Sequence, residues 1–162
     1  MPAEVAQEIF RVLSACRSVE LAMAGLYEAL AELHDHDPPM ARLWRKTAGE
    51  ELNHAAQFSL LLESMPDAVV GTTVDSRTLD SLRLAIEATI EEYHLRSPTA
   101  REALVAAIDF EETMDRTHAH QALIFTAPRT KQLFQAMMAA DRGHVAKLRA
   151  ALTKLGTAKP RA

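Results

Sequence analysis

Four long segments of this sequence each carry a stripe of apolar residues with helical spacing, and an acidic residue interrupts every stripe. The apolar positions recur in steps of three and four residues, which is typical of a helix that packs in a bundle. In the first segment, the stripe runs from Ile9 through Glu20 to Leu30. These stripes predict long helices at about residues 3–33, 39–64, 99–124 and 128–156, and a fifth, purely apolar stripe predicts a shorter helix at about 77–94.

The two halves of the sequence repeat each other, which indicates two helical hairpins. A shift of 90 or 91 residues places acid on acid and histidine on histidine: Glu20 on Glu111, Glu51 on Asp141, and His54 on His144. A long middle connection between two hairpins is a known four-helix-bundle topology. We therefore expect an all-α four-helix bundle in a single domain over residues 1–156, with hairpins at about 3–64 and 99–155, a crossover helix at about 77–94, and a frayed tail at 157–162.

Composition and charge exclude several other classes. Glycine and proline together make up 12 of the 162 residues, which is too few for a turn-rich all-β chain. The net charge of −4 offers no basic field for nucleic acid. Cys16 is the single cysteine, so a disulfide framework and every cysteine-pair metal motif are excluded. Without a leader segment or an apolar run of ~18 residues, we expect a cytoplasmic protein that binds neither membrane nor nucleic acid.

The acids on the buried stripes need cations, because burying an unpaired carboxylate costs several kcal/mol. The stripes supply no lysine or arginine beside them, but His54 and His144 each follow an acid by three residues on the same helical face. Two divalent ions would balance four carboxylates, and oxygen and imidazole ligands without thiolate suit iron or manganese. We therefore expect a dinuclear metal site with six protein ligands: Glu20, Glu51, His54, Glu111, Asp141 and His144.

Four further residues lie close to these ligands in the sequence. Tyr27 and His118 stand two turns after the lone acids of their helices, where either can hydrogen-bond a ligand or move protons. For Tyr27, a simple packing role in the core is equally consistent with the pattern. Glu50 and Glu112 adjoin proposed ligands, but each is rotated by about 100° from the stripe, so we expect both in solvent.

With this ligand pattern, the chain resembles the rubrerythrin branch of the ferritin-like superfamily over roughly residues 9–155. The paired lone acids, the two acid-x-x-His motifs, the Glu20-to-Tyr27 spacing and the crossover helix carry the resemblance. It implies a left-handed four-helix bundle, two iron ions with manganese or zinc as alternatives, and a homodimer that reduces hydrogen peroxide or dioxygen. Because Cys16 cannot build the rubredoxin-like domain of rubrerythrin, it also implies a separate electron-donor protein.

The resemblance further implies a role for each ligand, with two departures from the family pattern. Asp141 stands where the family has glutamate, and Met114 stands where it has an additional glutamate, so six ligands rather than seven are implied. Glu51 and Asp141 would bridge or chelate the metals, the two lone glutamates would bind one metal each, and the two histidines would be terminal nitrogen ligands. Two alternatives stay open: iron or manganese binding without turnover, and a structural bundle with a degenerate metal site.

Overall fold

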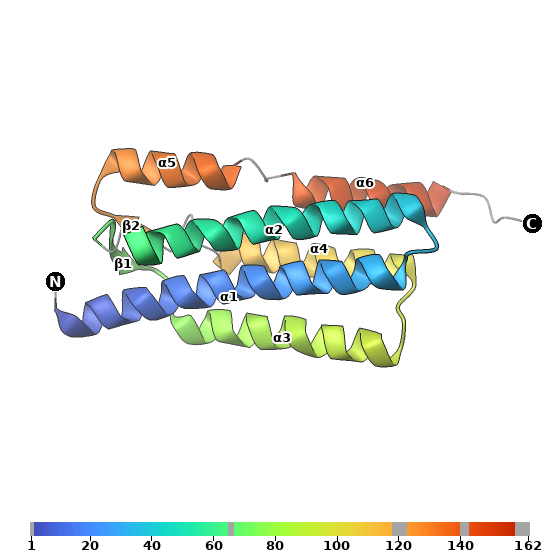
Figure 1. The fold of residues 1–162 in the computed structure, drawn as a ribbon, viewed down its shortest axis with the longest axis horizontal. Coiled ribbons are helices and arrows are strands. Elements are labelled where there is room, and N and C mark those ends of the chain that lie inside the picture. Colours follow the sequence, from blue (N-terminus) through green and yellow to red (C-terminus); the bar gives the residue numbers. More distant parts are fainter. Residues whose placement is uncertain (1, 65–66, 118–122, 140–142, 158–162) are drawn as a thin grey trace, which may run out of the picture.

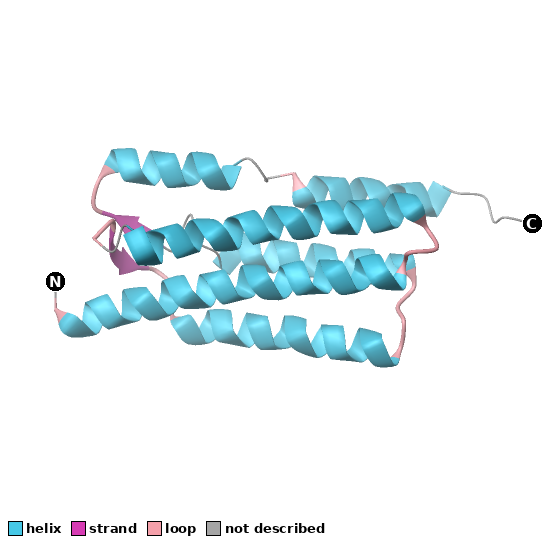
Figure 2. Cartoon of the chain, viewed as in Figure 1, coloured by secondary structure: helices cyan, strands magenta, loops and turns pink. Residues whose placement is uncertain are grey.

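The computed structural model describes residues 2–64, 67–117, 123–139 and 143–157, and it shows an elongated, all-α helical bundle (Figures 1 and 2). The first two helices form a long antiparallel hairpin, and the helices of the second half lie alongside it. Over the described ranges, the helices are α1 (Ala3–Leu33), α2 (Pro38–Ser64), α3 (Ser76–Leu95), α4 (Ala100–Thr117), α5 (Pro128–Ala139) and α6 (His144–Thr157). Two short strands, β1 (Val69–Thr72) and β2 (Leu123–Phe125), pair at one end.

The α1–α2 hairpin follows the sequence pattern closely. Helix α1 has 31 residues, and the stripe that contains Glu20 is buried along its length. The helix ends at Leu33, and α2 begins five residues later at Pro38, where the backbone N–H of Met40 donates to Oδ1 of Asp37 at 3.2 Å. The side chain of Asp37 thus satisfies one of the unpaired N–H groups in the first turn of α2, with Pro38 at the first helical position.

The crossover helix α3 packs on the side of α1 that faces away from α2 in the view of Figure 1. Asp75 caps its start, since Oδ1 accepts the backbone N–H of Thr78 at 2.9 Å. The next helix, α4, begins with a capping box formed by Thr99 and Glu102. The backbone N–H of Thr99 donates to Glu102 at 2.8 Å, and the N–H of Glu102 donates back to the Thr99 hydroxyl at 3.2 Å.

The predicted end of the helix expected at residues 99–124 is wrong. Helix α4 ends at Thr117 as described, and residues 123–125 form strand β2 instead. This strand pairs antiparallel with β1, which lies between the helices expected at 39–64 and 77–94, and Val69 is opposite Phe125. Three consecutive apolar residues fit a strand as well as a helix, so periodicity alone could not separate the two.

The last predicted helix, 128–156, is described as two helices, α5 and α6. They lie end to end along α2, and α6 also packs against α4 (Figure 1). Helix α6 begins at His144, directly after Gly143, a residue type with low helix propensity. It extends to Thr157, and the remaining tail, 158–162, lies outside the described residues.

The core is closed at the strand end by aromatic side chains from three elements. Phe134 of α5 lies edge-on to Phe58 of α2, with ring centroids 5.7 Å apart, and 5.4 Å from the ring of Phe125 in β2. This cluster fixes α5 and the strand pair against α2. Among the described residues, no helix combines the length and apolar character that crossing a membrane requires.

Candidate metal centre

The structure brings together every predicted metal ligand that it describes. Glu20 comes from α1, Glu51 and His54 from α2, Glu111 from α4, and His144 from the first turn of α6. All five side chains are buried, with at most 8% of any residue exposed. The prediction that these acids and histidines face the core is therefore confirmed. The sixth predicted ligand, Asp141, lies outside the described residues, as does His118.

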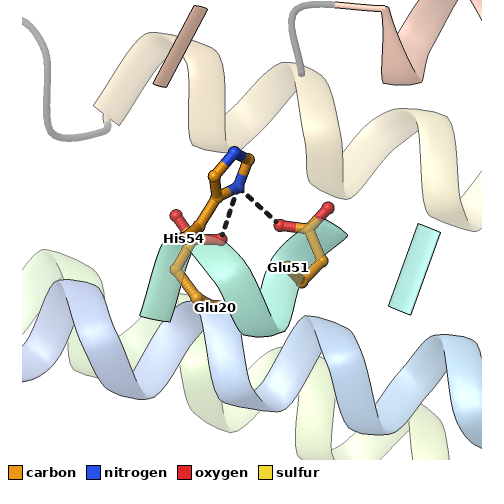
Figure 3. Close-up of side chains that lie close together, drawn as sticks. All are labelled: Glu20, Glu51 and His54. Atoms are coloured by element: carbon orange, nitrogen blue, oxygen red, sulfur yellow. Dashed lines mark hydrogen bonds and ion pairs between the residues drawn. The ribbon is translucent and has the colours of Figure 1, made fainter. Parts of the chain in front are cut away.

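The first group of ligand atoms consists of Glu20, Glu51 and His54 (Figure 3). Nδ1 of His54 lies 3.1 Å from Oε2 of Glu51, within hydrogen-bonding geometry, and 3.6 Å from Oε2 of Glu20. The imidazole nitrogen therefore points between two carboxylates that come from different helices. One ligand atom from each residue lies within 4.8 Å of the other two.

The second group consists of Glu51, Glu111 and His144, and it meets the same 4.8 Å limit. Nδ1 of His144 lies 2.8 Å from Oε1 of Glu51 and 3.5 Å from Oε1 of Glu111. Glu51 thus belongs to both groups, with Oε2 directed to the first and Oε1 to the second. A carboxylate that presents one oxygen to each of two groups has the arrangement of a bridging ligand.

The buried charges shift the proton affinities of these groups strongly. Burial alone would lower the pKa of both imidazoles, but contacts with the neighbouring carboxylates outweigh it and raise the pKa of His54 to about 11 and that of His144 to about 10. Burial raises the pKa of Glu20 well above its usual value and also raises that of Glu111. The pKa of Glu51 is instead lowered, because hydrogen bonds from both imidazoles outweigh the effect of its burial. In the protein alone, two imidazolium groups therefore compensate the buried carboxylates.

The donor set of the two groups fits divalent metal ions of the iron or manganese type. It consists of carboxylate oxygens and imidazole nitrogens, without a thiolate. Bonds of roughly 2.0–2.2 Å from one metal to such ligands place the ligand atoms up to about 4 Å apart, so each group needs only small side-chain movements to close on an ion. Both imidazoles direct Nδ1 towards the carboxylates, so the same nitrogen can become a ligand in each group.

Tyr27 combines the two roles that the sequence left open. Its ring is fully buried and stacks on Trp44, with centroids 5.7 Å apart and an interplanar angle of 18°. Its hydroxyl donates to Oε1 of Glu111 at 2.5 Å. Burial and the nearby carboxylates raise the pKa of Tyr27 well above its usual value, so the hydroxyl keeps its proton and remains a donor.

Sequence reasoning missed Glu50, which it placed in solvent. The Glu50 side chain is only 16% exposed, and its Oε2 lies 2.8 Å from Nε2 of His144. Both of its oxygens also accept from Nζ of Lys147 at 3.1 Å. Glu50 does lie off the apolar stripe of α2. However, α6 covers that side of α2, and the local sequence pattern gives no sign of this contact. Glu112, the other flanking acid, is partly exposed and forms an ion pair with Arg149.

Comparison of the sequence with known protein families gives one match. A family model described as Rubrerythrin matches residues 12–152 of this chain. No protein of the curated set matches, and no solved structure matches. The matched range includes both groups of ligands and the whole crossover.

Proposed function

We propose a function from the premise that this chain belongs to the rubrerythrin family: it binds two iron ions in the bundle core and reduces hydrogen peroxide, or dioxygen, with them. The observation that carries the proposal is Glu51, which is shared between two buried groups that each hold two carboxylates and one imidazole. A single bound ion would not require a carboxylate shared in this way.

Each group supplies the ligands of one ion in this proposal. Glu20 and His54 would hold the first ion, Glu111 and His144 would hold the second, and Glu51, which belongs to both groups, would be shared between them. Asp141, which matches Glu51 in the sequence repeat, is proposed as the sixth ligand. Four carboxylates and two neutral imidazoles then balance the charge of two divalent ions, so the bundle core becomes electrically neutral.

When bound, two ferrous ions would supply the two electrons that are needed to cleave the O–O bond of peroxide and form two waters. The residues of this chain would exclude water from the ions and orient their ligands. Burial of the ligands keeps bulk water away and strengthens every electrostatic contact. Tyr27 holds Glu111 through its hydroxyl proton at Oε1, which fixes the orientation of that carboxylate. The two waters also require two protons, and the Tyr27 hydroxyl is a buried group that carries one within 2.5 Å of a ligand oxygen.

We also propose that the electrons come from a separate donor protein and that the chain works as a homodimer. The first point is supported by Cys16, the single cysteine, which is buried in α1 and cannot form a cysteine-ligated iron centre alone. The second rests on the family. The mass of one chain is 17.9 kDa, and light scattering should give twice this value. A cage-sized assembly would instead favour iron storage.

The test begins with metal content. The protein is loaded anaerobically with ferrous iron, desalted and analysed for elements, and the loaded sample is then mixed with peroxide in a stopped-flow instrument. We expect two irons per chain and one peroxide consumed for every two ferrous ions oxidised. Two irons without peroxide or dioxygen consumption would contradict the oxidoreductase and leave a metal-binding protein. No uptake of iron, manganese or zinc would contradict the metal site itself.

A further inference from the structure

We infer that Glu50 is a positioning residue for His144, whose imidazole it holds in the orientation that binds a metal. This inference rests on the proposed function, since it concerns the second ion, the one held by Glu51, Glu111 and His144. Glu50 itself is not one of the proposed ligands. It contacts the far side of the imidazole ring, away from the carboxylates that would share the ion.

The ring of His144 lies between carboxylates on both sides. Nδ1 is 2.8 Å from Glu51, and Nε2 is 2.8 Å from Glu50. The contact with Glu50 is an ion pair at Nε2, and it leaves Nδ1 directed at Glu51 and Glu111, where the ligand atom is needed. Glu50 therefore holds the ring from the side opposite the ligand atom, as partners of metal-bound histidines commonly do.

Glu50 is held in place from the same helix that carries His144. Lys147 lies one turn after His144 in α6, and its Nζ is 3.1 Å from both oxygens of Glu50. Lys46 adds a weaker contact from α2 at 3.7 Å. The first turn of α6 is thus joined to α2 at two points, through the imidazole and through the ammonium. Lys147 also offsets the charge that Glu50 would otherwise bring to a half-buried position.

The sequence repeat does not duplicate this contact. The shift of 90 residues that matches Glu51 with Asp141 places Glu50 on Ala140, which has no side-chain oxygen. The chain therefore supplies this carboxylate once, from the first hairpin to a ligand of the second. A change at residue 50 should accordingly affect one of the two metal positions and not both.

Binding of Co²⁺ and ¹¹³Cd²⁺ to the full chain tests the inference. We expect the wild type to bind two Co²⁺ per chain and to show two ¹¹³Cd resonances. In Glu50→Ala, one Co²⁺ should bind about 10- to 100-fold more weakly, and one of the two ¹¹³Cd resonances should shift. In Glu50→Gln, the loss of Co²⁺ affinity should be smaller, because the amide keeps the shape and polarity of the side chain beside Nε2. Glu112→Ala is the matched control, since it removes an ion-paired glutamate beside Glu111 and should change neither readout.

Two results would overturn the positioning role while leaving the metal site intact. One is a Glu50→Ala variant whose two Co²⁺ affinities and two ¹¹³Cd resonances equal those of the wild type. The other is an equal loss at both positions together with a lower melting temperature of the metal-free variant, which would show a general structural role. A wild type that binds no metal would instead overturn the proposed function, and with it this inference.

Discussion

At the scale of single residues, Glu51 is the described ligand that connects the two groups of the candidate centre. Its two oxygens face different imidazoles, and it is the one ligand common to both groups. The pKa of Glu51 is low because both imidazoles stabilise its charged form. Removal of its negative charge should therefore affect two metal positions at once.

We predict that Glu51→Gln lowers the affinity for both ions by at least about 10-fold, the lower end of losses caused by changes around metal ligands. The amide keeps the shape of the side chain but cannot bridge two ions as a charged group. Equilibrium dialysis with Co²⁺ measures both affinities. Glu112→Gln makes the same chemical change outside the two groups and should bind two ions normally. Retention of both affinities in Glu51→Gln would contradict the bridging role.

The two raised histidine pKa values predict how the stability of the metal-free protein depends on pH. The folded pKa is about 11 for His54 and about 10 for His144, against an ordinary value of 6.5. Between these values the folded state holds protons that the unfolded state releases, so the stabilisation is complete below about pH 6.5 and is lost as the pH rises towards 10–11. The expected slope is on the order of 1 kcal/mol per pH unit for each imidazole.

Urea unfolding of chelator-treated protein at several pH values between 6.5 and 9.5 checks this prediction. The unfolding free energy should fall steadily across the series. Replacement of both histidines by glutamine should flatten the slope, whereas replacement of the exposed His36 should leave it unchanged. A stability that rises with pH over this interval would show that the imidazoles are neutral in the folded protein.

At the scale of elements, helix starts are the most locally determined features of this fold. Asp37, Asp75 and Thr99 each cap the helix that follows them, through hydrogen bonds between residues three apart in sequence. Such contacts form before any tertiary packing is needed, which is why the sequence reveals them. Ends of elements are less local, as the end of α4 and strand β2 show.

We predict that Thr99→Ala destabilises the protein by about 1 kcal/mol, the usual cost of losing a side-chain cap. The change removes the hydroxyl that accepts the backbone N–H of Glu102 at 3.2 Å. Thermal or urea unfolding measures the effect. Ser81→Ala is a suitable comparison, because it removes an exposed hydroxyl that bonds only to a carbonyl in the same helix, and it should be close to neutral. Equal effects in both variants would contradict the cap.

At the scale of the whole molecule, the candidate centre joins four helices from both halves of the chain. Its described ligands come from α1, α2, α4 and α6, so a bound metal would link the first hairpin to the second. The capture of ligands from segments far apart in sequence couples metal binding to folding of the entire bundle.

We predict that metal removal lowers the melting temperature of the whole protein in one cooperative step. A ligand that binds the folded state alone stabilises it by about 2.7 kcal/mol at 100 times its dissociation constant. Calorimetry with and without a chelator measures the difference, and readdition of metal should restore it. The Glu51→Gln variant should show a much smaller chelator effect. An unchanged melting temperature of the wild type would favour a structural bundle with a degenerate metal site.

The sequence by itself determined which faces of the long helices are buried. Glu20 and Glu51 fall on their apolar stripes, and a position on a stripe depends only on the 3.6-residue period of the helix. The repeat then related the two halves, so the described ligands of both groups could be named before any contact was known. Helix caps depend on equally local contacts, because their partners are three residues apart in sequence.

Only the tertiary structure decided which helix covers which side of another. Glu50 lies off the stripe of α2, and it is half-buried because α6 packs over it and brings His144 and Lys147 within reach. Strand β2 likewise exists because β1, more than 50 residues earlier, offers it a pairing edge. These outcomes depend on the rotation and register of packed elements, which arise from contacts between distant residues and leave no trace in a local pattern.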